Sequence, residues 1–208
     1  MKLPFLLPLF LLVSCAPATQ VPSQTEVVTA WATSAAQPWL SELFVCANDL
    51  SIAVNVTPQE PEIRLRVGEP ESLLSTAFKI AEEEILVVAH RESPVQNLSP
   101  EEAQALFAGE ADPATQVWAY ASDEDVQVAF DRLVMKERRV TSYAKMATSP
   151  QQMSDILNAE FNAIGILPRH WKMGSAREVY SAGTVPVLAI TKVEPSGAVQ
   201  ELIACLQK

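Results

Sequence analysis

Two neighbouring hydroxyl residues, Thr33 and Ser34, stand where an α/β protein commonly places an anion. They follow the apolar stretch 26–32, which predicts a strand, and they precede a predicted helix that residues 35–38 open. The free N–H groups at a helix start, together with nearby hydroxyls, donate hydrogen bonds to negative charge. The sequence therefore predicts that Thr33 and Ser34 contact an anionic ligand. Simple capping of the helix is the alternative.

Residues suited to catalysis or metal binding are scarce. His90 and His170 are the only two histidines, and neither has a second metal ligand at helical spacing. The chain has six glycines and contains no nucleophile motif, phosphate-binding loop or dinucleotide-binding glycine pattern. We therefore expect no enzyme activity, no catalytic residue, no cofactor and no metal site.

Acidic residues gather in two predicted turns, 68–72 and 121–125. These acids are Glu69, Glu71, Asp123, Glu124 and Asp125. If the two turns converge across a cleft, their carboxylates form a site for a cation or an amine. The alternative is that each charge is simply solvated.

The charge balance argues against nucleic acid as a partner. The 208 residues include 15 Lys and Arg against 25 Asp and Glu, a net charge of −10. Such an acidic chain repels the phosphate backbone, and no basic stripe or RNA-binding motif offsets this repulsion. We expect no nucleic-acid binding.

The first residues read as a bacterial export signal. Lys2 provides a positive start, residues 3–13 are apolar, and the stretch is too short to span a bilayer comfortably. Residues 12–15, LVSC, resemble the lipobox in which the cysteine is acylated. We expect a lipoprotein signal peptide over 1–14, a lipid anchor on Cys15 and a flexible tether over 15–25. An ordinary secretory peptide is the alternative.

We predict that segment 84–110 lies at the centre of the fold. Apolar residues 85–89 are typical of a buried strand, and a turn containing Pro94 follows them. Ser99, Pro100 and the two acids after them form a helix start, and Gly109 ends the helix. Other strands are predicted at 52–56, 63–67, 117–120, 161–168 and 185–190, and other helices at 126–135, 151–157 and 198–207. This alternation predicts an α/β fold.

Residues 97–109, NLSPEEAQALFAG, resemble the "NLTxEQLxxIFxG" helix of the phosphate-type, type 2 periplasmic binding proteins. Residues 163–165, AIG, resemble a strand of the second lobe of that family, and the likeness extends in order from Val27 to Leu206. The resemblance implies a two-lobed α/β fold with mixed sheets flanked by helices. Lobe 1 would comprise 26–88 plus 186–208, and lobe 2 would comprise 89–185.

The resemblance also implies a ligand held between the lobes by the turns that follow the strands. The implied ligand contacts are Thr33, Ser34, Glu69, Ser72, Tyr120, Ser122 and Glu124. The family carries an arginine near the place of Tyr120 and Ser-Gly-Thr at the following helix start, where this chain has residues 124–126, EDV. Carboxylates at a helix start satisfy the helix dipole themselves and would repel a phosphate.

Cys46 and Cys205 are the two cysteines that remain after the leader. An exported protein keeps disulfides, and in the resembling fold the first and last helices belong to the same lobe, so we expect a Cys46–Cys205 bridge. Two buried free thiols are the alternative.

The resemblance implies that the protein works outside the cytoplasm. The protein would be a monomeric substrate-binding lipoprotein, anchored to the bacterial cell membrane, that captures phosphate or another oxyanion for an ABC permease. The alternative is a membrane-anchored sensor or protein-interaction domain that has the same fold without small-molecule transport.

Overall fold

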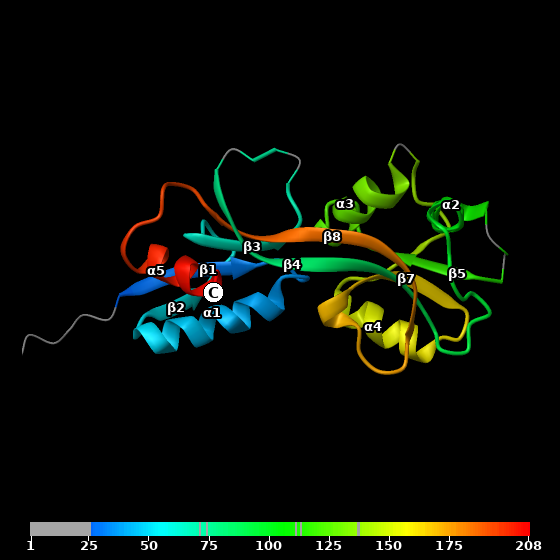
Figure 1. Cartoon of the computed structure of the whole chain (residues 1–208), viewed down its shortest axis with the longest axis horizontal. Coiled ribbons are helices and arrows are strands. Elements are labelled where there is room, and N and C mark those ends of the chain that lie inside the picture. The colour runs from blue at the N-terminus through cyan, green and yellow to red at the C-terminus, as the bar shows by residue number, and fades with distance from the viewer. Residues whose placement is uncertain (1–25, 71, 74, 111, 113, 137) are drawn as a thin grey trace, which may run out of the picture.

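Two long antiparallel strands, β4 (Thr76–Ala89) and β8 (Arg177–Thr191), run along the molecule and join its two halves (Figure 1). The computed structural model describes residues 26–70, 72–73, 75–110, 112, 114–136 and 138–208. The predicted signal peptide (1–14) and tether (15–25), with Cys15, lie outside the described residues, as does Glu71. β4 pairs with β8 from Thr76↔Thr191 to Ala89↔Arg177, so this ladder forms the spine of the fold.

The strands of the described residues form one eight-stranded mixed sheet in the order β2-β1-β3-β8-β4-β7-β5-β6. The remaining strands are β1 (Val27–Ala32), β2 (Ala53–Val56), β3 (Ile63–Val67), β5 (Gln116–Ala119), β6 (Lys145–Met146) and β7 (Ala163–Pro168). β1 is parallel to β2 and β3, and β5 is parallel to β6 and β7, whereas β3 and β7 pair antiparallel with the spine. The predicted α/β class is therefore confirmed, with one continuous sheet in place of separate ones.

The first half packs β1, β2 and β3 with helices α1 (Gln37–Leu50) and α5 (Gly197–Leu206). Its core comes from alternation along the strands, because Ile63, Leu65 and Val67 of β3 are completely buried while the arginines between them are not. The helices contribute apolar side chains such as Leu43 and Leu202, which are also fully buried. This half presents the ends of β1 and β3 to the other half.

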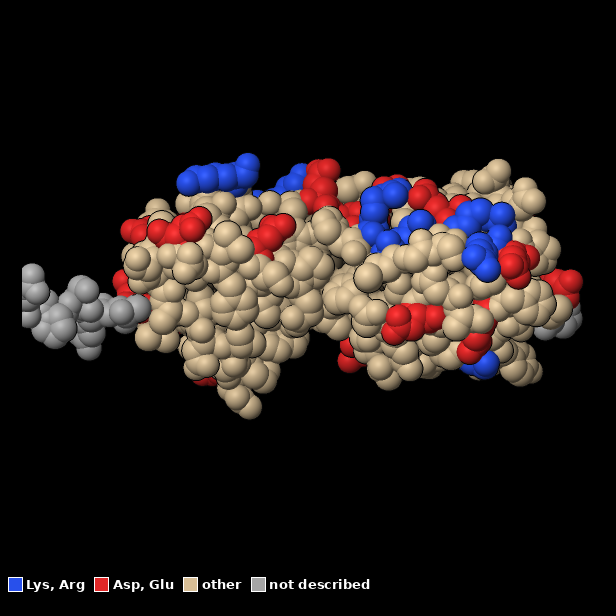
Figure 2. All heavy atoms as spheres, turned by 90° about the horizontal axis from the view of Figure 1, so that it is seen from below, with Lys and Arg blue, Asp and Glu red and all other residues tan. Residues whose placement is uncertain are grey.

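The second half packs β5, β6 and β7 with α2 (Pro100–Ala105), α3 (Asp125–Phe130) and α4 (Pro150–Ala159). α2 and α3 each continue into a π-helical segment, η1 (Leu106–Glu110) and η2 (Asp131–Met135) respectively. A 3₁₀ helix, η3 (Arg169–Trp171), follows β7. The two rings of Phe107 and Phe130, both fully buried, pack at 4.6 Å between centroids and fasten α2 to α3. Viewed from below, Lys and Arg side chains gather on this half, while the half with α1 shows few charges (Figure 2).

The helix starts predicted in the second half are confirmed. Ser99 accepts a hydrogen bond from the backbone N–H of Glu102, whose side chain accepts one from Ser99 N, so the two residues form a reciprocal capping box. Ser149 caps α4 by accepting from Gln152 N. Gly109, with φ 89°, lies in the left-handed region that glycine tolerates, and the α2 segment stops there as expected.

Two predictions of local structure are wrong. The capping of the first helix by Thr33 and Ser34 does not occur, because α1 begins at Gln37 and its N-cap residue is Ala36, which makes no side-chain cap bond. The central strand was predicted to start at residue 85, whereas β4 starts at Thr76. Its charged first part, which contains three successive glutamates, is strand because β8 supplies hydrogen-bond partners along its whole length.

The lobe boundaries predicted at 88–89 and 185–186 stay a prediction, because β4 and β8 run uninterrupted through both halves. Among the described residues, no helix has the length and apolar character that crossing a membrane requires.

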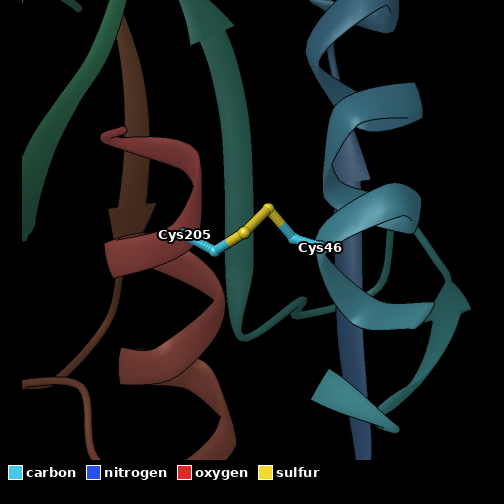
Figure 3. Close-up of a disulfide and its surroundings, with 2 residues drawn as sticks. All are labelled: Cys46 and Cys205. Carbon is cyan, nitrogen blue, oxygen red and sulfur yellow. A yellow bond between two sulfur atoms is a disulfide. The ribbon is translucent and has the colours of Figure 1, made fainter. Parts of the chain in front are cut away.

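The expected disulfide is present in the first half. Cys46 of α1 and Cys205 of α5 are bridged, with their Cα atoms 5.9 Å apart, and the bond joins residues separated by 159 positions in the sequence (Figure 3). It ties the last helix of the chain to the first. The alternative of two free thiols is excluded.

Replacing both cysteines by serine should lower the free energy of unfolding by about 5 kcal/mol, because the bridge closes a very long loop in the unfolded chain. The measurement is urea unfolding of the Cys46→Ser/Cys205→Ser variant beside the oxidised protein. The oxidised protein treated with a reductant is the matched control and should unfold like the variant. Equal urea midpoints for all three samples would contradict this prediction.

Candidate functional site

Three chain segments meet at the carboxylate of Asp125, the first residue of α3. Thr33, which follows β1, donates its hydroxyl to Asp125 Oδ2 at 2.5 Å, and the backbone N of Val67, at the end of β3, donates to the same oxygen at 2.9 Å. Asp125 is 3% exposed, so this charge is almost completely removed from water. A carboxylate of the second half is thus bound by donors of the first half.

The other oxygen of Asp125 is also satisfied. The backbone N of Val126 donates to Asp125 Oδ1 at 2.9 Å, at the start of α3. Both oxygens therefore accept hydrogen bonds, which is what keeps a buried carboxylate tolerable. The donor set of one hydroxyl and two backbone N–H groups is one that would equally suit a small anion.

A second carboxylate reinforces the contact. The hydroxyl of Ser34 donates to Glu124 Oε2 at 3.1 Å, so two consecutive hydroxyl residues bind two consecutive acids across 90 or more positions of sequence. The pairing also explains why neither Thr33 nor Ser34 caps α1, because their side chains are directed at the second half. The structure thus brings together Thr33, Ser34 and Glu124 from the predicted site.

Tyr120 lies behind this contact and not at a surface. Its side chain is 3% exposed, and its hydroxyl donates to the carbonyl oxygen of Ile166 at 2.9 Å. Burial raises the pKa of Tyr120 well above its ordinary value, and the nearby negative charges of Asp125 and Glu124 raise it further. The hydroxyl therefore stays protonated and acts as a structural donor.

Glu69, Ser72 and Ser122 are not among the hydrogen-bond partners of Asp125. Arg132 of η2 approaches Glu69, with Nη1 3.9 Å from Oε2, and its Nη2 donates to the Glu69 carbonyl oxygen at 3.4 Å. Ser72 and Ser122 are exposed. Ser72 lines a separate pocket on the first half. Contact of any of these residues with a ligand stays a prediction.

Arg66 lies close enough to Asp125 for the charge of the carboxylate to act on its guanidinium. Its half-buried side chain loses hydration, which lowers the pKa of the guanidinium, while the negative charge of Asp125 acts in the opposite direction. The positive charges of Arg64 and Arg132 lower the same pKa. The buried carboxylate thus has positive charge near it without a direct ion pair among the described residues.

Contacts of η3 also hold the two halves together. Trp171 Nε1 donates to the carbonyl oxygen of Ala35 at 2.9 Å, and the ring of His170 packs on Trp39 with 4.7 Å between centroids. His170 Nδ1 lies 2.8 Å from Glu83 Oε2, and Glu83 is 1% exposed. Burial raises the pKa of Glu83, and the neighbouring His170 opposes that shift. These residues pack between α1 and β4 close to the donors of the site.

The region between Thr33 and Asp125 is closed. The most clearly formed cavities in the described part of the chain are lined by other residues, and Thr33, Ser34 and Asp125 line none of these. The direct hydrogen bonds leave no room for a ligand in this arrangement.

Asp125 is the residue whose role sequence reasoning missed. It was grouped with the acids of the 121–125 turn, whose convergence on a cation was one hypothesis and whose solvation was the other. Neither holds for Asp125, because its partners are a hydroxyl and an amide 92 and 58 residues earlier in the chain. The available signal was a pair of acids at a predicted helix start, together with a pair of hydroxyl residues directly after the first predicted strand.

Solved structures share this architecture. A substrate-binding protein assigned to a phosphate ABC transporter of Clostridium perfringens, with bound phosphate, has a TM-score of 0.77 and 13% identity over 87% of this chain and 93% of its own. An ABC-type phosphate transport receptor of Vibrio cholerae has a TM-score of 0.66 and 15% identity, over 87% of this chain and 93% of its own. The reduced regulatory domain of OxyR2 of Vibrio vulnificus has a TM-score of 0.68 and 10% identity, over 91% of this chain and 98% of its own.

Comparison of the sequence alone gave a different result. No protein-family profile matches the chain, and no curated protein sequence matches it. At these identities the solved structures establish the fold alone. The chain has the two-lobed fold of phosphate-type periplasmic binding proteins, which regulatory domains also adopt.

Proposed function

We propose that the protein is an extracytoplasmic, membrane-tethered interaction or sensor domain whose interlobe anion site is filled by its own carboxylate. The observation that carries this proposal is the pair of hydrogen bonds that Asp125 Oδ2 accepts, one from Thr33 Oγ1 and one from Val67 N. The turn that holds Thr33 matches the turn that binds ligand in the resembling family. In this chain a side chain from the opposite half takes the place of a captured anion.

Electrostatics favours this proposal over phosphate capture. A phosphate placed between the halves would lie beside both Glu124 and Asp125 and would have to displace the second of them. Two like unit charges 4 Å apart repel by about 4 kcal/mol at an effective dielectric constant of 20. The arginine that the family uses near this place is here Tyr120, which is neutral and buried.

Ligand capture for an ABC permease is the second candidate. The resemblance to phosphate-binding proteins and the intact donors of Thr33 and Val67 favour it. An incoming anion would need a form in which Asp125 has left these donors. If breaking its hydrogen bonds costs about 4 kcal/mol, the competent form is roughly a thousandth of the population and the apparent affinity falls by the same factor.

The extracytoplasmic location rests on the leader and on Cys15. Acylation of Cys15 would hold the domain at the outer face of the cell membrane through the tether 15–25. The disulfide in the folded part of the chain suits an oxidising compartment.

Replacing Asp125 by alanine should lower the free energy of unfolding by about 3 kcal/mol, because the hydroxyl of Thr33 and the N–H of Val67 lose their charged acceptor. Urea unfolding measures the loss, and small-angle X-ray scattering should show a larger radius of gyration as the halves separate. Asp123→Ala is the control, since that exposed acid belongs to the same turn and its removal should change stability by less than about 0.5 kcal/mol. An Asp125→Ala protein as stable and compact as the parent would refute the internal lock.

Restoring the family's small residues should restore anion capture between the halves. We expect phosphate to raise the melting temperature of Glu124→Ser/Asp125→Gly by more than it raises that of the parent. At a phosphate concentration a hundred times the dissociation constant, the added stabilisation should be about 2.7 kcal/mol. Adding Thr33→Val should abolish the gain, whereas Thr33→Val alone should leave the parent's response to phosphate unchanged. Potassium chloride of equal ionic strength is the control. A parent protein whose phosphate response is lost on Thr33→Val would favour the second candidate.

Cys15→Ser should move the protein from the membrane fraction to the soluble fraction, because the acyl chains supply the anchoring free energy. Fractionation of the producing cells and labelling with a fatty acid measure the two effects. Thr19→Ser in the tether is the control and should remain labelled and sedimentable. An unlabelled parent protein would disprove the lipoprotein assignment.

A further inference from the structure

A pocket on the outer face of the first half gathers positive charge. Alternation along β3 directs Arg64 and Arg66 away from the core, because the residues that flank them are fully buried. β8 pairs antiparallel with β3 and sets Ile190 opposite Arg64. Lys192, which follows the end of β8, therefore reaches the same face and lines the same pocket.

Polar and apolar residues line the pocket together, and the apolar ones are Pro61, Pro70, Leu73 and Ile190. Its volume is about 250 Å³, which suits a small ligand. The hydroxyl residues Ser72 and Ser75, from the loop between β3 and β4, and Thr191, at the end of β8, join the three cations in its lining. Among the described residues that line it, none is Asp or Glu, although acids outnumber cations in the chain by 25 to 15.

The cations of the pocket have few direct partners among the described residues, although the negative charge of Asp125 acts on Arg66. Nε of Arg66 is buried and has no hydrogen-bond partner. Arg64 lies over the ring of Trp31, 5.6 Å from its centroid, a contact that orients the guanidinium without cancelling its charge. Lys192 pairs with Glu60 at 2.9 Å, but both side chains are mostly exposed, so this ion pair is weak and can rearrange.

We infer that this pocket binds a phosphate group, either free phosphate or a phosphate monoester carried by a lipid, at a site separate from the contact between the halves. Two guanidinium groups present planar N–H donors that match phosphate oxygens, and Lys192 adds a point charge. A group with two negative charges uses all three cations, whereas one carboxylate would use fewer.

The test uses inorganic phosphate and lipid vesicles as probes. Phosphate is titrated into the purified protein at constant ionic strength, with the heat of binding as the readout. Vesicles of phosphatidylcholine, with and without phosphatidic acid, are mixed with the protein and recovered by flotation. The main variant is Arg64→Gln/Lys192→Gln, whose two side chains are exposed, and Arg66→Gln is the second. Arg91→Gln/Lys145→Gln is the control, since it removes two exposed cations elsewhere.

We expect saturable phosphate binding with a dissociation constant below about 1 mM. The pocket variants should weaken it at least tenfold, and the control and Thr33→Val should leave it unchanged. Flotation that requires phosphatidic acid and is lost in the pocket variants, without binding of free phosphate, would also support the pocket and would identify a lipid as the source. The inference is overturned if neither probe binds, if the pocket variants bind as the parent does, or if Thr33→Val abolishes binding.

Discussion

The buried carboxylate of Asp125 is the interaction on which the arrangement of the two halves depends. An ionised carboxylate away from water is tolerated only with several donors, and this one receives a hydroxyl and two backbone N–H groups. Two of the three come from the opposite half, so separation of the halves would leave the charge and its donors to be satisfied by water. The contact therefore helps to hold the halves together and occupies the donors that would otherwise be free for an anion.

A rigid scaffold places the donors of this site. Thr33 and Val67 sit at the ends of parallel neighbours β1 and β3, so their separation is set by the sheet. The Cys46–Cys205 bridge ties α1 to α5 in the same half, and the β4–β8 ladder carries the second half to the position where α3 begins opposite these strands. Gly68, with φ 73°, lets the chain turn directly after Val67, and its backbone N donates to Pro186 O at 2.7 Å.

Two-lobed binding domains respond to ligands by shifting between open and closed forms, and only contacts that differ between the forms bias that equilibrium. In the function proposed for this chain, the bias toward closure is supplied from within, by Asp125 and Glu124 and by the contact of Trp171 with Ala35. A partner that prefers the open form would compete with these hydrogen bonds. A partner of the closed form would find it already assembled, and the cationic pocket of Arg64, Arg66 and Lys192 lies on the surface that remains accessible.

Local patterns in the sequence determined much of the fold. The capping box at Ser99, the stop at Gly109, the alternation of β3 and the positions of the apolar strands are all properties of short stretches, so they could be predicted from the residues alone. The placement of Thr33 and Ser34 at a strand end also followed from neighbouring residues. The length of β4 did not, because its charged first part becomes strand only through pairing with β8 about a hundred residues later.

Tertiary structure alone decided what Thr33 and Ser34 contact. The partners of their hydroxyls lie 92 and 90 positions away, and only the closure of the two halves brings them within hydrogen-bond distance. The same holds for the cationic pocket, which forms because an antiparallel register sets the end of β8 beside β3. The sequence determined which donors and charges exist and which strand ends carry them. The tertiary structure decided that a carboxylate of this chain accepts the hydrogen bonds of Thr33 and Val67, because sheet register and the approach of the two halves are set by contacts between distant segments.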